Sequence, residues 1–387
     1  MHGINLIGYF KGSFGLAVTT RAIAALMVKQ GISFCIIDLA NLSPHQSNTA
    51  TEDFSLFADY LSDTPIYEVN LFISGMNLKK HFDELNNKLA LNRQFNVWMV
   101  FVETYELGDM FMEMKDHCDM LIAPTRFIQY SLMRLVDRVY IEYMPPPLVI
   151  DQALKTELLK SKLKNKQFTF FYNFDLSSCV VRKNPYLLIR SFLEEFADDA
   201  SVQLTIKVNG ASSVKHQDQV DFLKKISADK NINLLFDYLP YHENLALIAN
   251  ADCYVSPHRS EGLGNGLFEA MHLGVPCIAT GFGGNTEFMN HGNAILLNYE
   301  LELNTSEMYR YFLRGKADYW ANISHLDLMF AMRRMREDEA LREQLIQNAF
   351  HTVNQLESEF LDTQVFENVF AKCDYEKTKR AHYAKTL

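Results

Sequence analysis

The stretch Glu261-Gly-Leu-Gly-Asn-Gly-Leu-Phe-Glu269 places two carboxylates on either side of a glycine-rich turn. The apolar run that begins at Cys253 predicts a strand before the turn, and the run that begins at Leu267 predicts a helix after it, ending at Gly274. A strand, a glycine turn and a helix together direct free backbone N–H groups and the positive end of the helix dipole at one point. Phosphate or sugar oxygens can bind at such a point.

The two carboxylates, Glu261 and Glu269, add hydrogen-bond acceptors that can hold paired hydroxyl groups. A site that binds phosphate and a diol together suggests a nucleotide sugar. The alternative is a pair of exposed carboxylates near a helix end, with Glu269 simply favoured by the positive helix terminus. Their position between an apolar strand and an apolar helix favours the binding interpretation.

The bulk composition predicts a folded protein of two domains. The chain has 387 residues, of which 48% are hydrophobic, so each domain can bury its own core. The net charge of −10 argues against a nucleic-acid partner, which would need a basic surface. Six cysteines without a Cys-x-x-Cys pair predict buried free thiols in a reducing compartment. Without a signal peptide or a long apolar run, we expect a soluble, cytoplasmic protein.

Apolar runs and helical stretches alternate twice along the chain, which predicts two Rossmann-like α/β domains. From about Asp318 onward the pattern becomes helical and charged. We therefore expect two facing domains, a cleft between them that both glycine turns face, and a C-terminal helical segment. The Pro145-Pro-Pro147 break and the Lys-rich residues after it set the first boundary. The predicted units are an acceptor domain (1–148), a linker (149–167), a donor domain (168–350) and a helical tail that packs back on the first domain (351–387).

Several blocks of the sequence resemble the retaining glycosyltransferases of family 4, which have the GT-B fold. The likeness covers most of the second predicted domain and parts of the first. The blocks that carry it, in chain order, are Phe101–Tyr105, Ala123–Phe127, Asn173–Pro185, His258–Gly264 and Ala279–Met289. Each block is weak evidence by itself, whereas the blocks together, in this order and at these intervals, are strong evidence.

The resemblance implies roles for matching residues. Glu269 would hold the ribose hydroxyls of the donor nucleotide, and Glu261 would lie near the transferred sugar. Lys183, with Arg182, would neutralise the diphosphate. The backbone amides around Gly264, Asn265 and Gly266 would contact sugar or phosphate.

One position departs from the family pattern. Many members have an arginine after the first strand of the donor domain, where this chain has Asn173-Phe-Asp. Lys207, at the end of the next strand, can supply the missing positive charge, or it can merely extend its amine to solvent.

Three further candidates each have a structural alternative, and ligand contact is favoured only for the glycine loop, because it follows the first strand. The loop from Gly12 to Gly15 can contact donor phosphate or acceptor, or it can be only a tight turn. Glu103, which follows an apolar strand, can orient the acceptor hydroxyl or accept its proton, or it can be a capping carboxylate. His258 can hydrogen-bond near the cleaved bond, or it can be a structural histidine at a strand end.

The resemblance implies a retaining transferase that moves a hexose from a UDP- or GDP-sugar to a glycan or lipid-linked acceptor, as in polysaccharide biosynthesis. No Asp-x-Asp motif occurs, so we expect neither a metal ion nor another cofactor. Two alternatives stay open: a catalytically silent GT-B scaffold subunit, and a sugar-nucleotide epimerase of the same shape. The Lys-rich linker and Lys377–Arg380 raise the hypothesis of a peripheral contact with the inner face of the membrane, against ordinary solvated surface charge.

Overall fold

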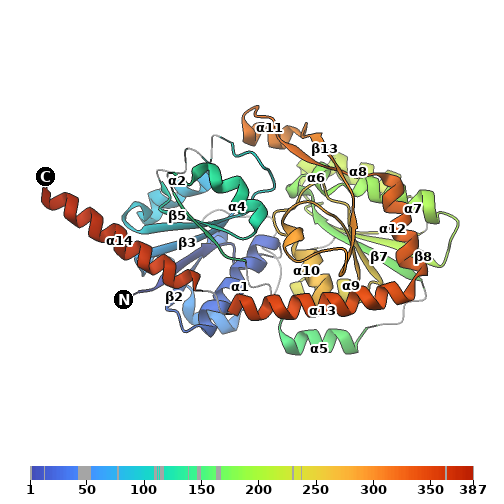
Figure 1. The fold of residues 1–387 in the computed structure, drawn as a ribbon, viewed down its shortest axis with the longest axis horizontal. Coiled ribbons are helices and arrows are strands. Elements are labelled where there is room, and N and C mark those ends of the chain that lie inside the picture. Colours follow the sequence, from blue (N-terminus) through green and yellow to red (C-terminus); the bar gives the residue numbers. More distant parts are fainter. Residues whose placement is uncertain are drawn as a thin grey trace.

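The computed structural model has two lobes that face each other, with long helices at the C-terminal end of the chain (Figure 1). It describes residues 2–12, 14–41, 54–75, 78–108, 111, 113, 117–137, 139–145, 150–162, 167–228, 231–236, 238–361 and 364–386.

The N-terminal lobe is built on a parallel sheet with the strand order β2-β1-β3-β4-β5-β6 in the described part of the chain. Apart from the edge strand β6, its strands are buried on both faces, as expected for a parallel sheet covered by helices on each side. The strands of this sheet are β1 (Ile4–Gly8), β2 (Phe34–Asp38), β3 (Val69–Ser74), β4 (Phe95–Val100), β5 (Met120–Ala123) and β6 (Tyr140–Tyr143). The helices of this lobe are α1 (Gly15–Lys29), α2 (Leu78–Leu89) and α4 (Arg126–Leu132).

The C-terminal lobe repeats this plan with the order β12-β11-β10-β7-β8-β9 among its described residues. The strands are β7 (Phe168–Asp175), β8 (Val202–Asn209), β9 (Ile232–Leu235), β10 (Cys253–Ser256), β11 (Cys277–Thr280) and β12 (Ile295–Leu297). The helices are α6 (Val180–Lys183), α7 (Pro185–Phe196), α8 (Gln217–Ile226), α9 (Tyr241–Ala249) and α10 (Asn265–His272). The chain order reverses between β7 and β10, and in parallel sheets ligands bind beyond the carboxyl ends of such strands.

A segment that the sequence analysis did not predict follows β12. Strands β13 (Glu300–Leu303) and β14 (Tyr319–Asn322) form an antiparallel pair, and α11 (Glu307–Leu313) lies between them in the chain. The prediction of helix from about Asp318 onward is therefore wrong for β14. This segment lies at the boundary of the two lobes, above the sheets in Figure 1.

The last helices connect the lobes a second time. α12 (His325–Glu337) packs on α7, and α13 (Glu339–Leu361) runs along the C-terminal lobe toward the N-terminal lobe (Figure 1). α14 (Val365–Thr386) then contributes Val365, Phe366 and Val369 to the hydrophobic core of the N-terminal lobe. The linker between the sheets contains α5 (Gln152–Lys160).

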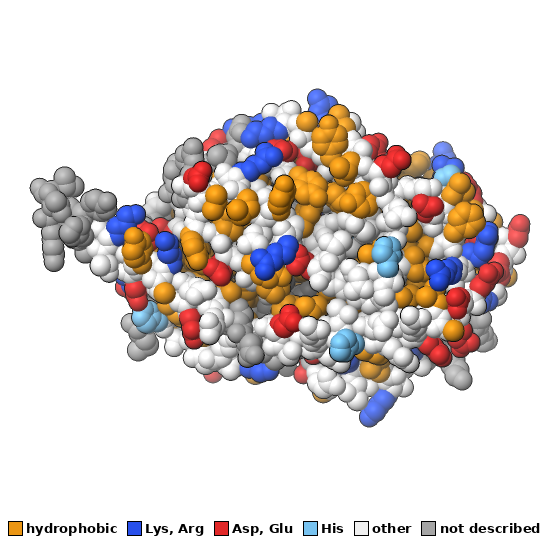
Figure 2. All heavy atoms as spheres, viewed as in Figure 1, with side chains coloured by type: hydrophobic (Ala, Val, Ile, Leu, Met, Phe, Trp, Pro, Cys, Tyr) orange, Lys and Arg blue, Asp and Glu red, His pale blue; other side chains and the backbone are white. Residues whose placement is uncertain are grey.

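The distribution of surface charge and the burial of the cysteines agree with the composition. On the face shown in Figure 2, lysine and arginine side chains are interspersed with aspartate and glutamate, while hydrophobic side chains gather over α4 and β13. Within the described residues, no helix has both the length and the apolar character needed to cross a bilayer. All six cysteines are buried and free, as predicted.

Candidate active site

A cavity of about 430 Å³ lies between the lobes and is lined by residues of both. Its C-terminal wall is formed by the carboxyl ends of β7, β8 and β10 and by the first turn of α10. Its N-terminal wall includes the start of α1 and the chain that follows β4. The cavity is therefore at the position that the strand order of the C-terminal lobe predicts for a ligand.

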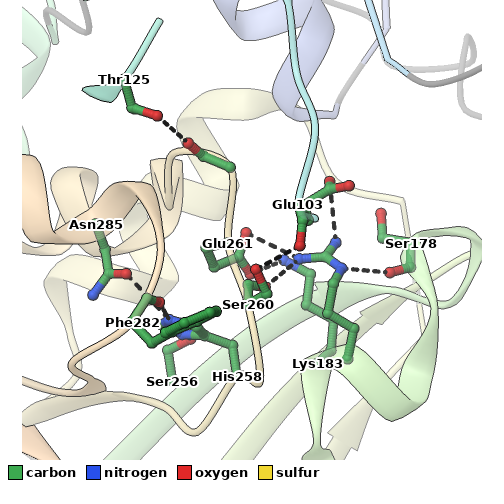
Figure 3. Close-up of polar contacts among 12 residues, drawn as sticks. Glu103, Thr125, Ser178, Lys183, Ser256, His258, Ser260, Glu261, Phe282 and Asn285 are labelled. Atoms are coloured by element: carbon green, nitrogen blue, oxygen red, sulfur yellow. Dashed lines mark hydrogen bonds and ion pairs between the residues drawn. The ribbon is translucent and has the colours of Figure 1, made fainter. Parts of the chain in front are cut away.

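Glu261 lies in the loop after β10 and is held between two cations (Figure 3). Lys183 Nζ donates a hydrogen bond to Oε1, and Arg182 Nη1 lies 3.2 Å from Oε2. The residue is only 8% exposed. Burial raises the pKa of this carboxyl, but attraction to Lys183 and Arg182 outweighs it and lowers the pKa to about 2. Glu261 is therefore a carboxylate at neutral pH.

Arg182 is almost completely buried, at 2% exposure, although an Arg-Lys pair is usually solvated. Its Nη1 donates to the Ser260 carbonyl at 2.8 Å, and its Nε donates to the Ser178 carbonyl at 3.2 Å. The guanidinium group thus fixes the loop that carries Glu261. It borders the cavity, but much of its hydrogen-bonding capacity is already used by the protein.

Lys183 is at the end of the short helix α6 and also lines the cavity. Tyr172 Oη donates to its carbonyl at 2.8 Å, which fixes the backbone beside β7. The next residue, Asn184, has a left-handed backbone with φ of 56° and donates from Nδ2 to the Pro257 carbonyl at 3.0 Å. Burial lowers the pKa of the Lys183 ammonium group, and Glu261 opposes this only in part.

Glu103 approaches the same cluster from the N-terminal lobe (Figure 3). Its Oε1 lies 3.5 Å from Arg182 Nη2, and its Oε2 accepts a hydrogen bond of 3.3 Å from Tyr309 Oη. Its carbonyl accepts a hydrogen bond of 2.7 Å from Ser260 Oγ, which joins the two lobes directly. The structure therefore brings Glu103, Arg182 and Glu261 together across the cleft.

Glu269 belongs to a second cluster on the same cavity. It is in α10 and is 6% exposed. Burial raises the pKa of its carboxyl to about 7, against a hydrogen bond from Tyr241 and the charges of Lys207 and Arg21. Lys207 is itself only 3% exposed, and its Nζ donates to Asn209 Oδ1 at 2.6 Å. Lys207 therefore does not extend into solvent.

The glycine turn between these clusters is shaped by close backbone approach. Gly264 has φ of +92°, a conformation that favours glycine. A Cβ on Gly266 would lie 2.3 Å from Tyr254 Oη and 3.0 Å from Asn173 Oδ1, so a side chain does not fit there. Asn265 Nδ2 donates to the Gly15 carbonyl at 3.3 Å. The first backbone N–H groups of α10, which have no partner within the helix, thus border the cavity.

Two predicted residues lie outside the cavity wall. His258 is completely buried, where it contacts Ser256 Oγ at 2.9 Å, the Phe282 carbonyl at 3.1 Å and Asn285 Oδ1 at 3.2 Å. Burial lowers its pKa to about 4, so the imidazole is neutral and supports the loops beneath Glu261 (Figure 3). Gly12 is also absent from the lining, whereas Gly15 contributes to it.

Several residues that complete the site were not predicted from the sequence. Tyr309 comes from the unpredicted α11, and Tyr241 begins α9. Tyr254 Oη donates to Asn173 Oδ1, and Asn173 Nδ2 donates to Asn244 Oδ1 at 3.2 Å. No local motif distinguishes these residues. The only available indication was that Asn173 stands where the family pattern has an arginine.

The comparisons with known proteins agree with this geometry. Residues 176–306 match the protein family described as "Glycosyl transferases group 1". No curated protein sequence matches the chain. The matched segment begins at the end of β7 and includes the loop and helix that carry Lys183, Glu261 and Glu269.

Solved structures share the fold at low sequence identity. Sucrose-phosphate synthase from Thermosynechococcus elongatus has a TM-score of 0.61 and 15% identity, with all of both chains covered. HepE from Anabaena, in complex with UDP and glucose, has a TM-score of 0.56 and 14% identity, also with both chains fully covered. The pneumococcal O-GlcNAc transferase GtfA, in complex with UDP and GlcNAc, has a TM-score of 0.54 and 14% identity.

The GtfA alignment covers 78% of this chain and 57% of GtfA, so the chain spans little more than half of that protein. Identities this low show the fold alone. The two parallel sheets with their helical C-terminal segment match GT-B structures, and the predicted fold class is confirmed. The match of residues 176–306 to the group 1 glycosyl transferases is therefore the finding that points to glycosyltransferase activity.

Proposed function

We propose that this chain is a retaining, metal-independent hexosyltransferase that uses a nucleotide-diphosphate sugar and a glycan or lipid-linked acceptor, as in polysaccharide biosynthesis. One observation carries the proposal. Lys183, Lys207 and Glu269 line a single cavity together with the N-terminal turn of α10. Cations and free amides suit a diphosphate, and a buried carboxylate suits a vicinal diol.

The donor contacts divide between the two clusters. Glu269 would accept hydrogen bonds from the ribose hydroxyls, and Lys183 and Lys207 would neutralise the diphosphate. Arg182 would act on the donor mainly through Glu261, because the protein already engages its guanidinium group. Glu261 would lie beside the transferred sugar. The HepE and GtfA structures hold UDP, so UDP-sugars are the first donors to test.

In the proposed reaction, the bond between the anomeric carbon and the diphosphate oxygen breaks, and the diphosphate keeps the electron pair. The acceptor oxygen forms its bond to the same face of that carbon and gives its proton to the departing phosphate. Lys183, Lys207 and the α10 N-terminus stabilise the charge that develops on the phosphate. These groups supply positive charge without a metal ion, so we expect chelators to leave turnover unchanged.

A donor-binding assay tests the site. Nucleotide sugars of uridine, guanosine and adenosine are screened by thermal shift, since a ligand at 100 times its Kd stabilises the folded state by about 2.7 kcal/mol. Lys183→Ala and Glu269→Ala should each weaken donor binding and reduce turnover about 10- to 100-fold, because each removes a charge-assisted contact. Lys215→Ala, at an exposed lysine of the same lobe, is the control.

The outcomes also separate the alternatives. Wild-type donor binding and turnover in both site variants would contradict the assignment. A protein that binds no nucleotide sugar would be a silent subunit. Conversion of the donor without an acceptor, found by product analysis, would indicate an epimerase. The anomeric configuration of the product, measured by NMR, tests retention.

Peripheral membrane contact stays a separate proposal with reduced support. Lys155 is buried against the Phe350 ring, and Lys377 is paired with Glu68, so these two lysines are already engaged. Lys164 and Lys166 lie outside the described residues. Sedimentation with anionic vesicles at low salt tests the proposal, and a protein that stays in the supernatant contradicts it.

A further inference from the structure

The two walls of the cavity differ sharply in chemistry. The C-terminal wall carries Lys183, Lys207, Asn209 and Glu269. The opposite wall is formed by the N-terminal lobe and α11, and most of its side chains are apolar or aromatic: Tyr9, Phe14, Leu16, Phe101, Met308 and Phe312. We call this second surface the acceptor wall. Within the proposed function, it faces the molecule that receives the sugar.

The aromatic character of the acceptor wall depends on glycines. A Cβ on Gly12 would lie 2.3 Å from the Phe14 ring, so Gly12 is required for that ring to fold back against the chain. Phe14 there meets the Tyr9 ring edge-on, with centroids 5.3 Å apart. A Cβ on Gly108 would lie 1.9 Å from the Phe312 carbonyl oxygen, so α11 can approach the N-terminal lobe only at a glycine.

A carboxylate supplies charge to the acceptor wall. Among the described residues that line this wall, Glu103 is charged, and none is lysine, arginine or histidine. The contacts of Glu103 Oε2 with Tyr309 at 3.3 Å and of Oε1 with Arg182 at 3.5 Å are long. A hydroxyl group of a ligand can therefore compete with Tyr309 and Arg182 for these oxygens.

This composition discriminates between acceptor classes. A phosphate placed against the acceptor wall would lose its hydration and be repelled by Glu103. The cation that contacts Glu103, Arg182, is already engaged by Glu261 and by two backbone carbonyls. A sugar ring has apolar C–H faces that pack on aromatic side chains, and its hydroxyl groups need acceptors such as a carboxylate. We propose that the acceptor is a neutral glycoside, whose pyranose ring packs on the aromatic residues of this wall while a hydroxyl group next to the reacting one donates to Glu103. The inference rests on the proposed function.

Matched acceptors test the inference. Methyl glycosides of several hexoses and N-acetylhexosamines are compared with the 1-phosphates of the same sugars, using a nucleotide sugar whose binding has been verified by calorimetry. Nucleotide diphosphate release and mass spectrometry of the product give kcat/KM. The neutral acceptors should exceed the phosphorylated ones by about tenfold or more, because one unpaired buried charge has at least this effect.

Variants of the acceptor wall sharpen the test. Phe101→Ala should raise KM for the methyl glycoside, with the donor Kd unchanged. Val18→Lys, which adds a cation to the wall, should shift the ratio of the two kcat/KM values toward the phosphorylated acceptor about tenfold. Tyr311→Lys makes the same kind of change on the exposed side of α11 and should leave the ratio unchanged. Because Phe101 also packs in the core, thermal unfolding checks that its variant folds.

The outcomes distinguish this inference from the proposed function. Preference for sugar phosphates, or turnover of no neutral glycoside by a protein that binds and hydrolyses its donor, overturns the acceptor class alone. Failure to bind any nucleotide sugar overturns both. A Val18→Lys variant that folds and keeps the ratio of the parent protein also counts against the inference.

Discussion

Glu261 and Glu269 share one turn-and-helix unit but have opposite electrostatic environments. Glu261 is between two cations, which lower its pKa to about 2 despite burial. Glu269 has a hydroxyl donor and more distant cations, and burial raises its pKa to about 7. The same residue type therefore serves two purposes. Glu261 is a fixed structural charge, whereas Glu269 can lose its proton when a ligand arrives.

Removing the two charges should change stability in opposite directions. Glu261→Gln leaves Lys183 and Arg182 without their buried counter-charge, which should cost about 3–5 kcal/mol. Glu269→Gln removes a carboxyl whose folded pKa is raised from 4.5 to about 7. The stability that this carboxyl contributes to the folded state is fully present below pH 4.5 and is lost as the pH rises through 7. At pH 8 the glutamine variant should therefore have a free energy of unfolding higher than the parent's by up to about 3 kcal/mol.

Thermal unfolding of both variants at pH 8 and pH 5 measures these effects. The advantage of Glu269→Gln should shrink at pH 5, where most of the folded protein already carries the proton. Equal destabilisation by both variants at pH 8 would show that the two environments are not as different as the contacts indicate.

The same ionisation should govern donor affinity. If ribose hydroxyls bind the Glu269 carboxylate, the free protein must release a proton below pH 7 before binding. The Kd of the nucleotide sugar should therefore weaken as the pH falls from 7 to 5, by up to tenfold per unit, and stay constant above 7. A nucleotide sugar suits this experiment because its diphosphate is esterified at both ends and does not titrate in this range.

Calorimetry in two buffers of different ionisation enthalpy measures the proton release directly. Glu269→Gln should bind more weakly but without the pH dependence. A parent protein whose affinity is constant from pH 5 to pH 8 would exclude a role for this carboxylate as the diol acceptor.

The sequence predicted the individual residues of the site better than the contacts between them. The spacing of Glu261 and Glu269 around a glycine turn is a local pattern, and their elements form as predicted. That Arg182 is buried behind Lys183, and that Tyr309 reaches Glu103, depends on segments far apart in the chain. No local pattern of residues contains such a contact, so periodicity and motifs could not reveal it.

At the scale of elements, a strand could be predicted from the sequence where it is buried in a sheet. Most strands of the two sheets are rich in buried apolar residues because helices cover both faces, and such runs are visible in the sequence. The β13–β14 pair is different. β13 alternates as Glu-Leu-Glu-Leu, but all four residues are exposed, so the alternation does not mark a buried face. In β14 the buried residues, Trp320 and Ala321, are adjacent and do not alternate. Charged residues around Asp318 favoured a helix instead.

This segment joins the lobes through Asp318. The carboxylate of Asp318 is 1% exposed, and its Oδ1 accepts hydrogen bonds from the backbone of Tyr105 at 3.0 Å and of Glu106 at 3.2 Å. Lys316 Nζ also donates to the Leu107 carbonyl at 3.2 Å. These contacts hold the loop that begins at Glu103, so the position of Glu103 depends on the segment that contains α11.

Asp318→Ala should therefore affect both stability and acceptor use. Two backbone N–H groups lose their partner, which should cost about 1–3 kcal/mol for each group left unsatisfied. Because the Glu103 loop loses its anchor, kcat/KM for the acceptor should fall more than donor affinity does. Thermal unfolding and steady-state kinetics measure the two effects, and Glu307→Ala, at an exposed carboxylate of α11, is the control. An unchanged acceptor kcat/KM in a destabilised variant would limit Asp318 to a structural role.

At the scale of the whole molecule, the lobes are closed on each other by polar contacts on both sides of the cavity. Thr125 Oγ1 donates to the Gly262 carbonyl at 3.1 Å, and Asn265 Nδ2 donates to the Gly15 carbonyl at 3.3 Å. The chain crosses between lobes before β7 and again between α13 and α14. Two covalent crossings restrict the lobes to a hinge motion, and the polar contacts decide how far the hinge opens.

Glu287 is well placed to test this closure because its two carboxylate oxygens bind two groups of the other lobe. One accepts a hydrogen bond from the Arg126 backbone, and the other accepts one of 3.0 Å from Tyr143 Oη. Glu287→Ala removes both bonds, and at about 1 kcal/mol each the ratio of open to closed protein should rise roughly tenfold or more. Small-angle scattering should then show a larger radius of gyration without ligand and a return toward the parent value with a nucleotide sugar. Glu300→Ala, at an exposed carboxylate of β13, should leave the curve unchanged. If Glu287→Ala scatters like the parent protein with and without ligand, these two bonds do not control closure.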